Sequence, residues 1–530
     1  MIRYFFAVIL FVTFAFTSVA QTGDLPRSTP EAEGVDSSLL NQVFNKITAL
    51  PNVDVHHLMV VRHGKVIGEL HAYPYQADHL HTLYSASKTV TGLAVGLAVD
   101  DGLLKVDDKV SKYLRDKMPA KLSPGLDSLT VRNMLMMSAG RQQDLDIFMG
   151  ETDWLTTWFK GDFHGPGQRF SYDSMCTFAL ATIVTRLTGK PLLDYVRERI
   201  FEPMHITQVD WEIAPDGVVT AGWGLRLQAE SEAKLGLLML HDGEWNCKQL
   251  ISKEWIHEMT QRHISTRTSP LPKLSLIQKI TNFMRSIWHK IRSWFSGYNV
   301  DDYFLGYGYQ IKSILQPRAE IFFATGYGGQ LIYVVPKLDM VIAINGRANN
   351  YGDELKVVYD DLVEPLISGE KIEPISASPV PIALPKGVAT HPLEARLFSS
   401  IIIPEKNLLG LQSITVAPMG NDRIFTMTDW RGPLRAVAAC GEWRITTCDD
   451  RPIYIMESRE QLVGTQRPFT SAAAYAWQGD TLALRLDWLD GGDNRRLKMF
   501  FDGDSAIIVA NDNYDLLISD TIPAVIRSKQ

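Results

Sequence analysis

Cysteine is scarce in this chain, with 4 residues among 530. Disulfide bridges therefore cannot supply the framework of the fold, which must rest on a hydrophobic core. Cys440 and Cys448 flank a short β-like stretch and are close enough in sequence to pair across a loop. Cys176 and Cys247 lie in apolar contexts that predict buried thiols. The sequence is compatible with a Cys440–Cys448 disulfide and equally with two free thiols.

An excess of positive charge is also missing. The chain has 53 Lys and Arg against 60 Asp and Glu, which gives a formal net charge of −7 at pH 7. Such a balance offers no overall attraction for phosphate backbones, and no basic run with interleaved aromatic residues follows a nucleic-acid fold signature. We therefore expect no nucleic-acid partner.

The N-terminal apolar stretch is too short for a typical membrane span. Tyr4–Phe16 follows Arg3 and precedes the small residues Ser18 and Ala20. This order is typical of a secretory signal peptide over residues 1–20. The competing interpretation, a transmembrane anchor, needs a run of roughly 20 apolar residues. We expect a periplasmic or secreted protein that is cleaved after Ala20.

The length of the chain predicts two or three domains. Residues 25–370 mix helical patterns with short strands, and Val55–Arg62 and Lys65–His71 read as an opening hairpin. Residues 371–392 are rich in proline, which a packed helix or a central strand would not accept. We therefore predict an interdomain linker there.

Residues 393–530 show a different pattern, with alternating apolar and polar residues. Leu482, Leu484, Leu486 and Trp488 share one face, and turns rich in Asp and Gly follow. Period-two alternation between such turns is typical of antiparallel strands. We predict a small C-terminal β-barrel or β-sandwich.

Residues 271–297 look like an insertion with helical periodicity. Its apolar residues at helical spacing are Leu276, Ile280, Phe283, Ile287, Ile291 and Trp294. Its basic residues are Lys273, Lys279, Arg285, Lys290 and Arg292. A basic amphipathic helix of this kind suits peripheral contact with an anionic membrane surface. A helix that covers a cleft or packs on the neighbouring domain fits the pattern equally well.

Ser85 and Lys88 are the first candidate catalytic residues. They open the small-residue helical run Thr89–Val99, so the i, i+3 spacing puts both side chains on one face of the first turn. A serine attacks only if a base takes its proton, and a desolvated lysine can serve as that base. The same spacing recurs at Ser231–Lys234 and Ser368–Lys371, but only the first pair opens a buried helix.

A second candidate segment is the turn that ends in Tyr172, two residues before Ser174. A tyrosine just after a turn can point its phenol into a cleft, where a nearby ammonium would help it relay protons. Taken separately, Tyr172 is typical of a half-buried packing residue. Ser174 by itself is typical of a helix N-cap.

A glycine-rich segment, Ala324–Gln330, lies between two apolar strands. Glycine lets a strand approach bound substrate closely and leaves a backbone N–H to stabilise an oxyanion. A plain turn between the two strands fits the segment as well.

These three elements, in this order, resemble the serine β-lactamase-like superfamily, which includes class C β-lactamases, family VIII esterases, penicillin-binding proteins and 6-aminohexanoate-oligomer hydrolases. Those families carry Ser-x-x-Lys, then Tyr-x-Asn or Tyr-x-Ser, then Lys/His-Thr-Gly. The resemblance implies an α+β catalytic domain, with an antiparallel sheet flanked by helices and a helical subdomain, ahead of the all-β C-terminal domain. It implies no cofactor and no metal.

The resemblance also assigns roles. It implies that Ser85 attacks an acyl carbonyl while Lys88 and Tyr172 move the proton to the leaving group. It implies a substrate-binding role for Ser174, Thr325 and Gly326. The backbone N–H groups of Ser85 and Tyr327 would form the oxyanion hole, or that of Gln330 if the motif slides onto Tyr327-Gly328-Gly329.

Two positions depart from the family pattern. Ala324 replaces the cationic or imidazole residue of the third motif, and Ser174 replaces the Asn of the second. Both positions help to hold substrate in the family, so an ester, amide or peptide-like small molecule fits better than a β-lactam. The alternatives are a penicillin-binding D,D-peptidase or β-lactamase, and, in another class, a catalytically silent envelope scaffold or membrane-binding protein.

Overall fold

The computed structural model describes residues 24–51, 53–148, 153–266, 306–316, 319–348, 351–369, 378–429, 432–448, 462–465, 469–512 and 518–529. The expected signal peptide and the insertion at 271–297 lie outside these ranges, as does the first part of the predicted linker. Among the helices in the described ranges, none combines the length and the hydropathy that crossing a bilayer requires.

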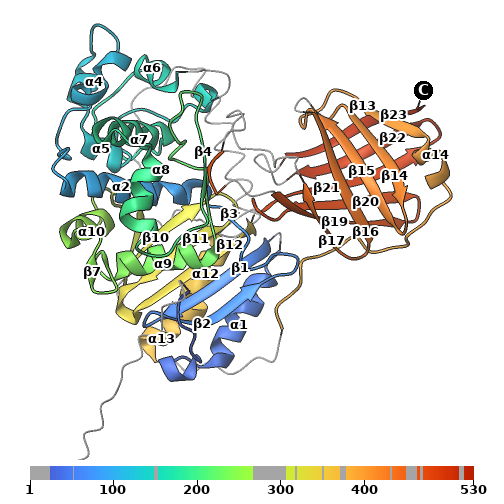
Figure 1. Cartoon of the computed structure of the whole chain (residues 1–530), viewed down its shortest axis with the longest axis horizontal. Helices are drawn as coiled ribbons and strands as arrows, with labels where there is room; N and C mark the ends of the chain where they lie inside the picture. Colours follow the sequence, from blue (N-terminus) through green and yellow to red (C-terminus); the bar gives the residue numbers. More distant parts are fainter. Residues whose placement is uncertain are drawn as a thin grey trace, which may run out of the picture.

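A seven-stranded antiparallel sheet forms the centre of the N-terminal domain (Figure 1), in the order β2-β1-β12-β11-β10-β9-β8. Its strands are β1 (Val53–Arg62), β2 (Lys65–His71), β8 (Gly306–Tyr307), β9 (Lys312–Gln316), β10 (Ala319–Gly326), β11 (Gln330–Val335) and β12 (Met340–Ala348). The predicted opening hairpin is confirmed as β1 and β2. Because β1 pairs with β12, the start of this domain closes against its end.

The two faces of the sheet carry separate cores. Along β1, Leu58 and Val60 pack into one apolar cluster, whereas Met59 and Val61 pack into the other. This is the period-two alternation that a strand covered on both faces requires. The first cluster includes the helices α1 (Ser37–Thr48), α12 (Tyr351–Val358) and α13 (Glu364–Ser368).

The second face supports α2 and a helical subdomain, drawn at the upper left of Figure 1. The helices on this side are α2 (Ser87–Asp100), α3 (Ser111–Leu114), α4 (Pro124–Ser128), α5 (Val131–Leu135), α6 (Trp154–Phe159), α7 (Ser174–Thr188), α8 (Leu192–Val196), α9 (Ala229–Leu240) and α10 (Lys253–Thr260). Residues 87–98 of α2 are all buried. A helix apolar on every side can exist only inside a core, and α2 lies there against α7.

The C-terminal domain is a closed barrel of nine strands, in the order β16-β15-β14-β13-β23-β22-β21-β20-β19. Its strands are β13 (Ser400–Pro404), β14 (Ser413–Met419), β15 (Asp422–Asp429), β16 (Gly432–Cys440), β19 (Phe469–Gln478), β20 (Thr481–Trp488), β21 (Asp493–Asp502), β22 (Ser505–Asp512) and β23 (Ile518–Ser528). The parallel pairing of β16 with β19 closes the ring. The predicted α+β fold class, with its all-β C-terminal domain, is confirmed, and a barrel replaces the alternative of a sandwich.

Strand β17 (Arg444–Cys448) explains why no disulfide joins Cys440 to Cys448. Cys440 pairs with Tyr475 and Cys448 pairs with Phe469, six positions apart on β19. At ~3.3 Å per residue, the two backbones are about 20 Å apart, beyond the reach of a disulfide. Cys440 is accordingly a free cysteine.

The prediction of a buried thiol is correct for Cys176 and wrong for Cys247, which is exposed. Asn246 and Cys247 both have positive φ, in the two-residue turn that joins β6 (Glu244–Trp245) to β7 (Lys248–Gln249). Two consecutive residues of this conformation are typical of a hairpin turn, which points side chains into solvent. The apolar surroundings of Cys247 in the sequence do not reveal this turn.

The C-terminal part of the chain also contributes to the N-terminal domain. A four-stranded sheet has the order β18-β4-β5-β3 and contains β3 (His81–Thr82), β4 (Asp210–Glu212), β5 (Leu225–Leu227) and β18 (Leu462–Gly464). The barrel adds ion pairs to this connection, since Arg485 and Arg496 both bind Asp54 of β1. The two domains are therefore held together by backbone pairing and by buried charge.

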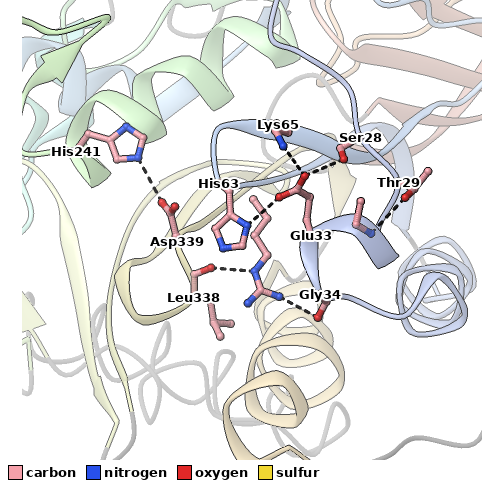
Figure 2. Close-up of polar contacts among 11 residues, drawn as sticks. Ser28, Thr29, Glu33, Gly34, His63, Lys65, His241, Leu338 and Asp339 are labelled. Atoms are coloured by element: carbon pink, nitrogen blue, oxygen red, sulfur yellow. Dashed lines mark hydrogen bonds and ion pairs between the residues drawn. The ribbon is translucent and has the colours of Figure 1, made fainter.

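A polar cluster fixes the end of the sheet at which β1 turns into β2 and β11 turns into β12 (Figure 2). Glu33 accepts hydrogen bonds from Lys65 and Ser28 and pairs with His63. These contacts lower the pKa of Glu33 to about 2. Across the same end, His241, the C-cap residue of α9, points to Asp339 in the β11–β12 turn. This cluster lies at the opposite end of β11 from Gln330.

Four histidines form a cluster beside the barrel. The His56 Nδ1 to His81 Nε2 distance is 2.9 Å, and the His57 Nδ1 to His71 Nδ1 distance is 2.8 Å. Burial lowers the pKa of each ring, that of His81 to about 3. The rings are therefore neutral at physiological pH.

A buried neutral ring predicts a specific pH dependence of stability. Below about pH 6.5 the unfolded chain binds a proton at His81 that the folded protein does not bind, so acid weakens the fold. We expect acid to destabilise wild type relative to His81→Gln, with a slope in the free energy of unfolding that approaches about 1.4 kcal/mol per pH unit as the pH falls from 6.5 to 5. Guanidinium unfolding followed by tryptophan fluorescence measures it. A pH-independent difference contradicts the prediction.

Candidate active site

Ser85 lies in a single turn of 3-10 helix, Tyr84–Ala86, that leads directly into α2. The expectation that Ser85 stands inside the first turn of the α-helix is therefore wrong by two residues, because α2 begins at Ser87. The preceding residue, Tyr84, has a φ of 47°, which is uncommon outside glycine. Ser85 is half-buried at the N-terminal end of α2.

Lys88 reaches Ser85 from the next turn. Its Nζ lies 3.2 Å from Ser85 Oγ and donates to the carbonyl of Gly222 at 2.7 Å. Only 1% of Lys88 is exposed. Burial, with a smaller contribution from the charge of Lys312, lowers the pKa of Lys88 from 10.5 to about 7. The structure thus places an amine that is half uncharged at neutral pH next to the hydroxyl.

Tyr172 completes the group. Its ring centroid lies 4.8 Å from Lys88 Nζ, and the Ser85 side chain is near enough to its phenol to act on the pKa of that group. Burial raises the pKa of Tyr172, so the phenol keeps its proton at neutral pH. The structure brings together the three residues that the sequence selected as the catalytic set.

Ser174 is the first residue of α7 and is buried. A Cβ on Gly222 would lie 3.3 Å from Ser174 Cβ and 3.4 Å from Lys88 Nζ, so Ser174 borders the Lys88 site. The helix-cap role that Ser174 suggested in the sequence belongs instead to Asp173, whose carboxylate accepts from Met175 N at 2.9 Å.

Thr325 and Gly326 end β10 directly beside the nucleophile. A Cβ on Gly326 would lie 2.0 Å from the carbonyl oxygen of Leu83, so only glycine permits this approach. Tyr327 begins the turn that follows, and its ring packs edge-on against Tyr84 at 5.7 Å. Gln330 opens β11 with its side chain bonded to the carbonyls of Tyr327 and Gly346. The end of β10 and the turn that follows it therefore pack against Leu83 and Tyr84.

Lys312 is a site residue that the sequence analysis missed. It lies on β9, where it pairs with Phe323 of β10, and its Nζ donates to Thr325 Oγ1 at 2.7 Å. Ala324, on β10 itself, carries no charge. The ammonium beside Thr325 comes instead from the adjacent strand. The feature of the sequence that could have indicated Lys312 is its position as a single lysine between the apolar residues Ile311 and Ile314.

Asp173 is a second missed residue. It is fully buried and accepts a hydrogen bond from Trp158 Nε1 at 2.8 Å. Burial raises its pKa to about 6. Its charge favours the protonated form of Lys88 and so partly opposes the effect of Lys312. The signal in the sequence was its position between Tyr172 and Ser174.

Comparison with known proteins gives a consistent family match. A family model described as Beta-lactamase matches residues 45–358. A 6-aminohexanoate-dimer hydrolase from Paenarthrobacter ureafaciens is 25% identical over 222 residues, which cover 38% of this chain and 56% of that protein. Protein flp from Staphylococcus aureus strain N315 is 24% identical over 172 residues, which cover 29% and 34%. The chain thus spans about a third to a half of the curated relatives it matches.

Among solved structures, a penicillin-binding protein homologue from Caulobacter crescentus is 18% identical with a TM-score of 0.47, and the match covers 64% of this chain and all of that one. An octameric penicillin-binding protein homologue from Pyrococcus abyssi is 16% identical with a TM-score of 0.43, and covers 89% of this chain and 96% of that one.

The position of Lys312 predicts a shift in a pH profile. We expect the rate at which a fluorophosphonate labels Ser85 to rise with pH around a midpoint of about 7, because only uncharged Lys88 can accept the serine proton. Lys312→Gln removes a neighbouring positive charge, so the midpoint should move to higher pH. Lys312→Arg keeps the charge and should retain the wild-type midpoint. Identical profiles for all three proteins would show that Lys312 does not act on Lys88.

Proposed function

The chain belongs to the beta-lactamase family, and from this premise we propose that it is a serine hydrolase that cleaves an ester or amide bond through an acyl-enzyme on Ser85. The observation that carries the proposal is the grouping of Ser85, Lys88 and Tyr172: Lys88 Nζ lies 3.2 Å from Ser85 Oγ and 4.8 Å from the ring centroid of Tyr172. A serine with two proton-handling partners is the arrangement that covalent acyl transfer requires.

Acylation follows from these contacts. Uncharged Lys88 takes the proton as Ser85 Oγ bonds to the substrate carbonyl carbon, and the carbonyl oxygen becomes an oxyanion. Backbone N–H groups of Ser85 and Tyr327 would stabilise it. When the bond to the leaving group breaks, its alkoxide or amine takes a proton through Tyr172 and Lys88. Water, deprotonated by the same pair, then hydrolyses the ester on Ser85 and restores the hydroxyl.

An ester, an amide or a peptide-like small molecule is the substrate class we propose. A 6-aminohexanoate-dimer hydrolase among the relatives supports an amide. Penicillin-binding D,D-peptidase or β-lactamase activity is the second candidate. Lys312 favours it, because its ammonium beside Thr325 offers a substrate carboxylate the positive charge that Ala324 cannot supply.

We further propose that the protein acts in the periplasm or outside the cell. The order of Arg3, the apolar stretch Tyr4–Phe16 and the small residues Ser18 and Ala20 supports export. The basic amphipathic pattern of residues 271–297 supports peripheral membrane contact as a separate proposal. Co-sedimentation with anionic liposomes, with and without residues 271–297, tests the second point.

Covalent labelling tests the assignment of the nucleophile. We expect a fluorophosphonate to label wild type and not Ser85→Ala. Ser231→Ala is the matched control, because Ser231 has the same spacing to a lysine but lies in α9, and it should be labelled like wild type. Equal labelling of wild type and Ser85→Ala would refute the proposal.

Turnover tests the proton-handling role of the phenol. We expect Tyr172→Phe to lower kcat by about 10²–10⁴-fold on its best substrate, because the leaving group loses its proton donor. A panel of nitrophenyl esters, D-amino-acid amides and a chromogenic cephalosporin identifies that substrate. Unchanged kcat in Tyr172→Phe would remove Tyr172 from the mechanism.

A further inference from the structure

We propose that Asp493, on the C-terminal barrel, is a positioning residue for the oxyanion hole of the N-terminal domain. The inference rests on the proposed function. It assigns to the barrel a part in catalysis, through a buried cluster of three side chains that we call the Tyr84–Arg347–Asp493 cluster.

The barrel reaches the site through the turn between β20 and β21. Gly492 in this turn has a φ of 80°. A Cβ there would lie 1.9 Å from His81 Nε2, so the turn packs tightly against β3, which precedes Ser85 in the chain. Asp493 follows as the first residue of β21 and is only 4% exposed. A barrel residue is thus buried next to the chain segment that leads into Ser85.

Asp493 binds the residue that precedes the nucleophile. The hydroxyl of Tyr84 donates to Asp493 Oδ1 and accepts from Arg347 Nη1 at 3.0 Å. Tyr84 is 2% exposed and has the positive φ described above. A non-glycine residue keeps such a conformation only when its surroundings impose it, and the anchored phenol does so here. The direction of the Ser85 N–H depends directly on the Tyr84 backbone.

Arg347 extends the cluster to the other expected oxyanion donor. Its guanidinium carbon lies 5.5 Å from the ring centroid of Tyr84 and 5.4 Å from that of Tyr327. A Cβ on Gly328 would lie 2.7 Å from Arg347 Nη1, so the guanidinium supports the backbone of the Tyr327 turn. One buried cation therefore contacts both segments that would donate to the oxyanion.

The carboxylate of Asp493 gives this cation a buried negative partner. Arg347 Nη1 lies 3.5 Å from Asp493 Oδ1, and their side chains are 2% and 5% exposed. A buried guanidinium needs a nearby negative charge, since desolvation otherwise disfavours it strongly. Asn at position 493 keeps the shape but removes the charge, so Arg347 and Tyr84 should both relax.

A role limited to docking the barrel is the competing explanation. Arg496 provides the control, because it joins the barrel to Asp54 of the N-terminal domain and, within the described part of the chain, forms no hydrogen bond or ion pair with Tyr84, Arg347 or Tyr327. A purely structural role predicts that Asp493→Asn and Arg496→Gln have similar effects. A positioning role predicts that only Asp493→Asn impairs the chemistry.

The experiment compares full-length wild type, Asp493→Asn, Asp493→Glu, Tyr84→Phe and Arg496→Gln. We expect Asp493→Asn to lower kcat for a nitrophenyl ester, and the fluorophosphonate labelling rate, by about 10- to 100-fold with KM nearly unchanged, since small misplacements cost this much. Asp493→Glu should recover part of the rate, and Arg496→Gln should keep all of it. Tyr84→Phe, alone or combined with Asp493→Asn, should match the single Asp493→Asn loss.

Three outcomes would overturn the inference: wild-type kcat in Asp493→Asn, equal losses in Asp493→Asn and Arg496→Gln, or strictly additive losses in the double variant. If Asp493→Asn does not fold, Tyr84→Phe removes the same hydrogen bond from the other side, and a wild-type rate in that variant refutes the proposal. Failure of the proposed function is distinguished separately, because Ser85→Ala would then be labelled as strongly as wild type.

Discussion

The proposed chemistry of this site depends on keeping the amine of Lys88 away from water. The apolar helix α2, the cover provided by α7 and the carbonyl of Gly222 together leave it 1% exposed, and its pKa falls to about 7. In solvent the same amine would be fully protonated and useless as a base. The packing of the N-terminal core therefore also lowers the pKa of this one side chain.

Buried charge gives the two domains a common interior. Asp54 of the sheet binds Arg485 and Arg496 of the barrel, and Asp493 of the barrel lies beside Arg347 of the sheet. Removing one partner of a buried pair leaves the other charge buried and unpaired, which costs several kcal/mol. The pairs run in both directions across the boundary, since the sheet supplies the anion at Asp54 and the cation at Arg347.

Local periodicity made much of this structure predictable. The i, i+3 spacing placed Ser85 near Lys88, and alternation at Leu482, Leu484, Leu486 and Trp488 predicted the barrel strands. The residues that were missed come from pairings that no local pattern encodes. Lys312 enters through the register of β9 with β10, and Asp493 meets Tyr84 across 409 positions of sequence. The parallel closure of the barrel is equally non-local.

Strand β18 connects the two domains through an exchange of sequence between them. It belongs to the C-terminal part of the chain, yet it pairs with β4 in the small sheet. That sheet also contains β3, which ends just before the turn that carries Ser85. A gene cut at the proline-rich segment would consequently encode a catalytic half that lacks one of its own strands. A recombination event that exchanged the barrel would therefore also replace a strand of the N-terminal domain.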